Sequence, residues 1–158
     1  MTISIREYAP ADLAALRACF IALQDAVRVY EPRLRPGAEI VDEYHAVVQK
    51  RCAEQAGAIF LADAQGEVVG YVTVLARVPY EELDDPPGEY AYVMDLYVHE
   101  SLRGQGIGRA LLARAEAHAR KQGASELRIG ALAGNVGARE LYLGLGFAPQ
   151  LEILSKAL

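Results

Sequence analysis

The chain of 158 residues contains no tryptophan and only two cysteines, Cys19 and Cys52. The two cysteines form no C-x-x-C pair, so neither a dense disulfide scaffold nor a paired-thiol motif organises the chain. Both fall in helical patterns, and we expect reduced, partly buried thiols, although a bridge between them stays open at this stage. We expect no metal site.

Long apolar runs are also missing, since none reaches the roughly 18 residues that a membrane-spanning helix needs. The first ten residues, MTISIREYAP, lack a basic stretch followed by an apolar one, so we expect no secretory signal and a cytoplasmic location. Positive charge is scarce, because 16 Lys and Arg face 21 Asp and Glu, a net charge of −5. This balance argues against a nucleic-acid partner and is compatible with a cationic substrate, and the lack of long apolar runs argues against a membrane partner.

Apolar and charged residues make up 53% and 23% of the chain, which is typical of a globular protein with enough material for a core. The length and the lack of linkers or repeats predict a single domain over residues 1–158. Periodicity predicts an alternation of strands and helices. The expected strands cover residues 2–8, 58–62, 68–78, 90–98, 125–130 and 149–156. One helix is expected to start at Pro10, and three more are expected over residues 38–55, 104–122 and 135–144.

This order predicts an α/β fold with a mixed sheet. Residues 58–78 should form an antiparallel hairpin. The unit over residues 90–130 should place two strands parallel to each other, joined by a helical crossover.

The run RGQGIGR, residues 103–109, follows one of the parallel strands and opens the long helix. Three glycines, Gly104, Gly106 and Gly108, alternate through it, and glycine allows the backbone to approach a ligand closely. The first amides of a helix lack intrahelical partners and, with the helix dipole, favour a phosphate or pyrophosphate. Arg103 and Arg109 add positive charge whose geometry suits phosphate.

Three interpretations of this loop compete. An ordinary strand-to-helix turn would need only one glycine. A Rossmann site would need G-x-G-x-x-G, but the third glycine comes one residue too early, and Glu126 begins the next strand instead of ending it. A Walker loop is excluded because the chain has no Gly-Lys-Ser/Thr. The third interpretation, the pyrophosphate loop of coenzyme A, needs a second signal downstream.

That second signal starts at Asn135, where the chain reads NVGARELYLGLGF. Asn135 can cap a short helix that carries Tyr142, and the glycines of Leu145-Gly146-Phe147 and its surroundings can end it. Together with residues 103–108 and the strand DLYV that precedes them, this pattern resembles the GNAT superfamily of acyl-CoA-dependent N-acyltransferases. The resemblance is strongest over residues 90–148.

The resemblance implies a mixed sheet with central splayed parallel strands, flanked by helices, and transfer of an acetyl group from acetyl-CoA to a primary amine. It also implies that the pantetheine arm enters the gap between the splayed strands. Asn135 would contact the cofactor, and Tyr142 would both contact it and act as the general acid that protonates the leaving thiolate. The expected backbone contacts to the cofactor come from Leu96, Tyr97 and Val98 on the strand and from Arg103, Gly104, Gln105, Gly106, Ile107, Gly108 and Arg109 in the loop.

The general base is harder to assign. Strand alternation places Tyr90, Tyr92, Met94, Leu96 and Val98 on one face, which has no carboxylate. Asp95 points to the other face unless a β-bulge re-aims it, and we keep it as a candidate base or substrate anchor. An ordered water, the loop acids, His45 and His99 remain alternatives.

Acidic residues cluster in the loop before this strand, and most such clusters are simply solvated. Beside an amine-using site they suggest a cationic small amine or a peptide N-terminus as acceptor. A non-catalytic acyl-CoA-binding regulatory module and a nicotinamide-dependent oxidoreductase are the alternative functions, and a homodimer is possible. The acids are Glu81, Glu82, Asp84, Asp85 and Glu89.

Overall fold

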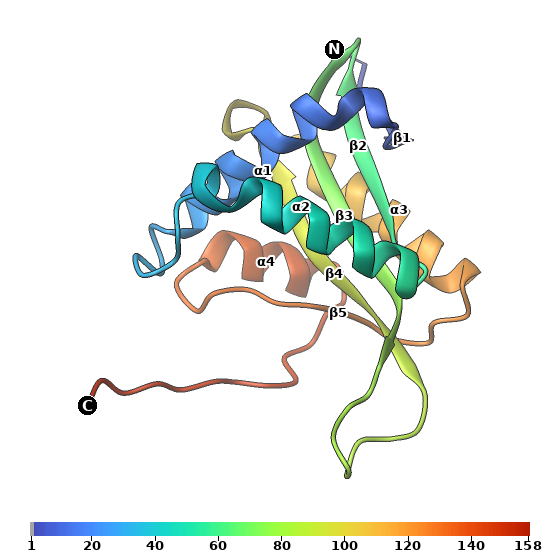
Figure 1. The fold of residues 1–158 in the computed structure, drawn as a ribbon, viewed down its shortest axis with the longest axis vertical. Helices are drawn as coiled ribbons and strands as arrows, with labels where there is room; N and C mark the ends of the chain where they lie inside the picture. Colours follow the sequence, from blue (N-terminus) through green and yellow to red (C-terminus); the bar gives the residue numbers. More distant parts are fainter. Residues whose placement is uncertain (1) are drawn as a thin grey trace.

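The computed structural model describes residues 2–158 and shows one five-stranded sheet with helices packed on both faces (Figure 1). The order of the strands follows the sequence, from β1 at one edge to β5 at the other. The elements are β1 (Ser4–Glu7), α1 (Leu13–Val27), α2 (Gly37–Glu54), β2 (Ala58–Ala64), β3 (Glu67–Pro79), β4 (Glu89–Val98), α3 (Ile107–Lys121), β5 (Leu127–Ile129) and α4 (Val136–Gly144), with short 3-10 turns at Pro10–Asp12 and Glu100–Leu102.

The first four strands pair antiparallel, and β5 pairs parallel to β4. The predicted fold class, a mixed sheet flanked by helices, is confirmed. Two apolar layers hold it together, because α3 packs on one face of the sheet and α1 with α2 on the other. β2 and β3 are buried on both faces, as their nearly continuous apolar sequences require, and Phe60 and Leu61 point into opposite layers.

The two parallel strands separate along their length. β4 pairs with β5 only from Ala91 to Val93, whereas β4 continues to Val98. The last five residues of β4 therefore have no strand on that side. This is the splay that the sequence resemblance implied, and it leaves backbone N–H and C=O groups that a ligand can satisfy.

A β-bulge interrupts β4 at Met94. Asp95 pairs with Thr73 of β3 and Val93 pairs with Val74, so Met94 has no partner across the ladder. The extra residue reverses the alternation, and Met94 packs in the α1/α2 layer while Leu96 and Val98 pack in the α3 layer. The prediction that Met94 shares a face with Leu96 and Val98 is wrong for this reason.

The end of the chain also differs from the prediction. Residues 148–158 form neither helix nor strand and are exposed throughout, so the strand expected over residues 149–156 is absent and β5 lies at the edge of the sheet.

Both cysteines carry free thiols. Cys19 is buried and Cys52 half-buried, and burial raises the pKa of each thiol to about 11, which makes both poor nucleophiles at neutral pH. Within residues 2–158 no cluster of His, Cys, Asp and Glu has the arrangement of a metal site. No helix in the same range is long and apolar enough to cross a bilayer.

Candidate functional site

The glycine loop turns sharply into α3. Gly104 and Gly106 have φ angles of 76° and 85°, in the left-handed region that favours glycine, and Gly106 is the residue that caps α3. A Cβ atom at either position would meet nothing within 4 Å, so these glycines are required by backbone conformation and not by space. Gly108 differs, because its Cβ would lie 3.4 Å from Leu141 of α4, and it lets α3 and α4 approach each other.

The loop presents a row of free amides. The first hydrogen bond of α3 runs from Ala110 N to Gly106 O, and in the described chain the amides of residues 104–109 donate to no loop, turn or strand. These N–H groups gather at the positive end of the α3 dipole. They fit a diphosphate by the chemistry of their donors, since each can donate to one phosphate oxygen.

Arg103 links this loop to the end of β4. Its Nε donates to the Val98 carbonyl at 3.0 Å, while the rest of the side chain is exposed. Arg109 is exposed on the first turn of α3, and Ile107 is buried and anchors that turn to the core. The loop therefore combines a fixed backbone with one guanidinium already tied to the strand edge.

The backbone of β4 faces the splay at alternate residues. His99 N donates to Val69 O of β3, so the amide of Tyr97, two residues earlier, also faces β3. The backbone groups of Leu96 and Val98 then face the side where β5 has separated. The Val98 carbonyl is used by Arg103, which leaves the N–H groups of Leu96 and Val98 available for a ligand.

The side chain of Tyr142 is positioned by the end of α4. Phe147 N donates to Tyr142 O and Gly146 N donates to Leu143 O, with Gly146 at φ 93°, and these bonds form a Schellman cap. The rings of Tyr142 and Phe147 lie 5.9 Å apart. At the other end of α4, Asn135 Oδ1 accepts from Ala138 N at 3.2 Å, which confirms its capping role and leaves its side-chain NH2 group free. Burial, with a smaller effect of Tyr92, raises the pKa of Tyr142 to about 12, so the phenol stays protonated at neutral pH.

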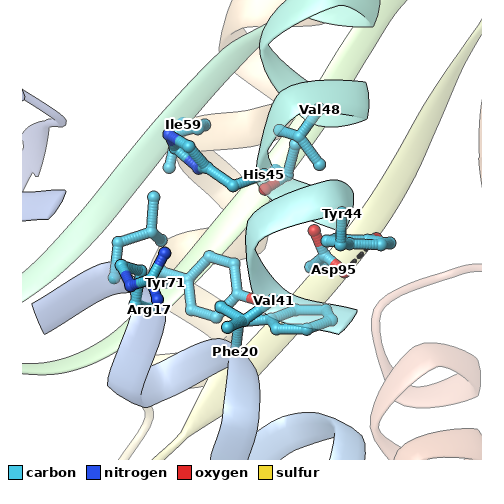
Figure 2. A pocket seen from close by; sticks show the side chains of 11 residues that line it. Arg17, Phe20, Val41, Tyr44, His45, Val48, Ile59, Tyr71 and Asp95 are labelled. Carbon is cyan, nitrogen blue, oxygen red and sulfur yellow. Dashed lines mark hydrogen bonds between the residues drawn. The ribbon is translucent and has the colours of Figure 1, made fainter. Parts of the chain in front are cut away.

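Asp95 lies in a small pocket on the opposite face, between α1, α2 and the sheet (Figure 2). The Tyr44 hydroxyl, from α2, donates to Asp95 Oδ1 at 2.7 Å. The hydroxyls of Tyr71 and Thr73 line the same pocket, and the Tyr71 hydroxyl has no hydrogen-bond partner within residues 2–158. The cavity measures about 20 Å³, which is room for one water molecule beside these oxygens.

The burial of Asp95 changes its chemistry. The residue is 6% exposed, and burial raises the pKa of the carboxyl group to about 6, although the hydroxyls of Tyr44 and Thr73 oppose this shift. The carboxyl group can therefore change its protonation state near neutral pH. Tyr44 was not among the residues that the sequence indicated, because no sequence signal linked it to Asp95.

Of the other candidate bases that the sequence suggested, His45 lines the Asp95 pocket and the rest lie away from it. The acidic loop joins β3 to β4 at the far tip of the hairpin, and Glu89 is six residues from Asp95 along β4, about 20 Å at the usual rise of a strand (Figure 1). His45 lines the Asp95 pocket, whereas His99 contacts Ser101.

The segment between α1 and α2 lies near the splay. A Cβ on Gly134 would lie 3.1 Å from the ring of Tyr30, so the α1–α2 segment reaches across to the β5–α4 segment.

Comparison with known proteins agrees with this geometry. Residues 18–147, well over half of the chain, match the family model described as the acetyltransferase (GNAT) family. The chain belongs to the acetyltransferase (GNAT) family. It is accordingly an acyl-CoA-dependent N-acetyltransferase, with acetyl-CoA as its cofactor.

Among its relatives is thialysine N-epsilon-acetyltransferase from Bos taurus, which is 31% identical over 125 residues, 78% of this chain and 68% of the relative. Aminoglycoside N(6')-acetyltransferase type 1 from Stenotrophomonas maltophilia is 34% identical over 96 residues, 60% of this chain and 62% of the relative. The solved structure of AAC(6')-Iy with the bisubstrate analog CoA-S-monomethyl-acetylneamine has a TM-score of 0.72 at 18% identity, over 100% of this chain and 99% of that one, and shows a shared fold.

Proposed function

We propose that this GNAT acetyltransferase transfers the acetyl group to the primary amine of a small cationic molecule or of a peptide N-terminus, by direct attack in a ternary complex. The observation that carries the proposal is the bulge at Met94. It places the Asp95 carboxyl group toward the α1/α2 face, one residue from the Leu96 amide that faces the splay.

The residues of the loop and of the strand edge would hold the cofactor. The amides of residues 104–109, with Arg103 and Arg109, would bind the diphosphate. The N–H groups of Leu96 and Val98 and the free amide of Asn135 would bind the pantetheine arm, with Tyr97 contributing only its place in the strand. Bound acetyl-CoA supplies the acetyl group as a thioester, a form activated for transfer to an amine.

Two side chains would transfer protons in this reaction, Asp95 as the acceptor and Tyr142 as the donor. Asp95, directly or through a water in its cavity, accepts the proton that the incoming ammonium must lose. The Leu96 N–H donates to the oxygen on which negative charge develops. Tyr142 donates to the leaving thiolate; its pKa of about 12, against about 8.5 for a cysteine-like thiol, makes hydrogen-bond stabilisation its first contribution. When the thiolate departs it takes the proton of the phenol, and the phenol regains one from the acylated nitrogen, which loses its second proton as the amide forms.

The preference for a cationic amine rests on the buried carboxyl group and the net charge of −5. The two relatives whose names refer to thialysine and aminoglycosides, both amines, support the same class. Tyr30 and the segment between α1 and α2 would border the approach of the acceptor, since they lie across the β5–α4 segment. The distance of the acidic loop from Asp95 reduces its role to long-range attraction of a cation.

The test is thiol release from acetyl-CoA with a panel of polyamines, lysine analogues, aminoglycosides and short peptides. We expect at least one cationic amine to give turnover well above that of neutral amines. In Tyr142→Phe we expect kcat to fall at least tenfold with little change in the affinity for acetyl-CoA. Tyr90→Phe, on the hairpin far from the splay, is the matched control and should retain full turnover. Equal kcat for Tyr142→Phe and the wild type would remove Tyr142 from the mechanism.

A further inference from the structure

A second pocket lies at the base of the β3–β4 hairpin, which extends past α2 (Figure 1). It measures about 270 Å³, near the lower end of the range of small-molecule sites. Its lining comes from four elements, with Arg51 near the end of α2, Tyr80 directly after β3 and Arg128 on β5. The residues assigned above to the cofactor and to proton transfer do not line it, so its chemistry needs a separate explanation.

Arg128 is held in place at this pocket. Its Nε donates to Glu126 Oε1 at 2.8 Å, and its guanidinium carbon lies 5.2 Å from the centre of the Tyr80 ring. The Tyr80 hydroxyl donates to Glu126 Oε2 at 2.8 Å, which fixes the ring. Nη1 of Arg128 has no partner among residues 2–158, so this fixed guanidinium group still has N–H donors to offer.

Arg51 supplies a second guanidinium group to the pocket. The residue is half-buried, and it forms no ion pair with any carboxylate of residues 2–158. A basic residue in the last turn of a helix also interacts favourably with the helix dipole, but that interaction does not require the side chain to line a pocket. A guanidinium group without a carboxylate partner, beside a second one, favours a ligand with a carboxylate or another planar anion.

On the sheet, Arg128 lies on the same side as Asp95. Its neighbours Leu127 and Ile129 pack in the α3 layer, so the side chain of Arg128 points to the α1/α2 face. Arg128 pairs with Tyr92, which is three residues before Asp95 on β4. At the usual rise of a strand this is about 10 Å.

On the helix, Arg51 follows the side chain that contacts Asp95. Tyr44, Val48 and Arg51 are spaced by four and three residues and therefore share one side of α2. The Tyr44 hydroxyl donates to Asp95, and Arg51 comes seven residues later, about 10 Å along the helix. Both estimates separate the pocket from Asp95 by a length that one small molecule can span.

Acidic side chains of the β3–β4 loop border the same pocket. Glu81, Glu82 and Asp85 line it, and Glu81 and Glu82 are exposed, whereas the two arginines are half-buried. Their distance from Asp95 limits these acids to long-range attraction there, but they adjoin this second pocket directly. Guanidinium donors and carboxylate acceptors therefore lie side by side, which is the complement of a zwitterion.

We infer that this pocket binds the α-carboxylate and α-ammonium groups of a free diamino acid, lysine or a shorter homologue, whose side-chain amine reaches Asp95 and is acetylated. Arg51, with Nη1 of Arg128, donates to the carboxylate, and the loop acids accept from the α-ammonium group. The inference rests on the proposed function, since Asp95 must receive the proton of the same molecule. It predicts that diamines without a carboxylate are poorer acceptors.

Thiol release with matched pairs of acceptors tests this inference. Lysine and cadaverine have the same chain and differ by the carboxylate, as do ornithine and putrescine. We expect the amino acid of the better pair to have a kcat/KM at least tenfold above that of its diamine in the wild type. In Arg51→Gln this preference should disappear through a higher KM for the amino acid, with kcat/KM for the diamine changed less than twofold, and Arg51→Lys should restore part of it.

The matched control is Lys50→Gln, which removes the same charge from the adjacent, exposed position and should keep the preference. Circular dichroism and acetyl-CoA binding show whether the variants keep their fold, and the comparison of acceptors in the wild type needs no variant. Equal kcat/KM within each pair, or a preference that Arg51→Gln leaves intact, would overturn the inference, while turnover of the diamines would leave the proposed acetyl transfer standing. No turnover with any amine would overturn both.

Discussion

Replacing Asp95 by asparagine should stabilise the protein at neutral pH while it removes the activity. Burial raises the pKa of the carboxyl group from 3.8 to about 6. One pKa unit corresponds to about 1.4 kcal/mol, so the shift of roughly two units lowers the free energy of unfolding by about 3 kcal/mol once the group is ionised. Because the folded-state pKa is raised, the contribution of Asp95 is fully favourable below pH 3.8 and is lost as the pH rises through about 6.

Asparagine keeps the shape of the side chain and can still accept from Tyr44, but it does not titrate. The difference in the free energy of unfolding between Asp95→Asn and the wild type should therefore grow in favour of the variant by about 3 kcal/mol between about pH 3 and about pH 7.5. Urea unfolding at a series of pH values measures it, and the other carboxyl groups titrate in both proteins and cancel. The wild-type kcat should rise through a pH near 6, because the base acts when deprotonated. A stability difference that stays constant over this range would refute the assigned burial and with it the proposed base.

Three further predictions follow from the geometry. In Tyr44→Phe, loss of the donor to Asp95 raises the carboxyl pKa further, so the rise of kcat should move to higher pH; an unchanged pH profile would mean that the contact has no role in the reaction. Gly70→Ala should lower the free energy of unfolding by about 1–3 kcal/mol, because the new Cβ would lie 2.5 Å from a carbonyl oxygen of β4, whereas Gly137→Ala, with nothing within 4 Å, should be neutral or slightly stabilising in the same denaturation assay. Asn135→Ala should lower the free energy of unfolding by about 1 kcal/mol through loss of the α4 cap, and an unchanged urea midpoint would contradict the capping role.

Local chemistry made much of this fold predictable. The alternating glycines of the loop, the cap at Asn135 and the Leu145-Gly146-Phe147 signal each act within a few residues, and each lies in the structure where the sequence placed it. The helices and strands follow for the same reason, since periodicity reports the face that an element buries.

Features that depend on pairing between distant segments were not predictable. The bulge at Met94 arises from the register between β3 and β4, and it changed which side chains share a face. The contact of Tyr44 with Asp95 joins residues 51 positions apart, and no local pattern connects them. The prediction of a strand over residues 149–156 was wrong for a related reason. Alternation of apolar and polar residues indicates a strand but does not identify the strand beside which it pairs.

The bond from Arg103 to the Val98 carbonyl joins the two regions that we propose contact opposite ends of a long cofactor. This bond adds a guanidinium link to the short stretch of backbone that already joins the strand edge to the loop. Adenosine diphosphate and pantetheine, supplied as separate fragments, should therefore influence each other's affinity, and this coupling should weaken when the arginine is shortened to alanine.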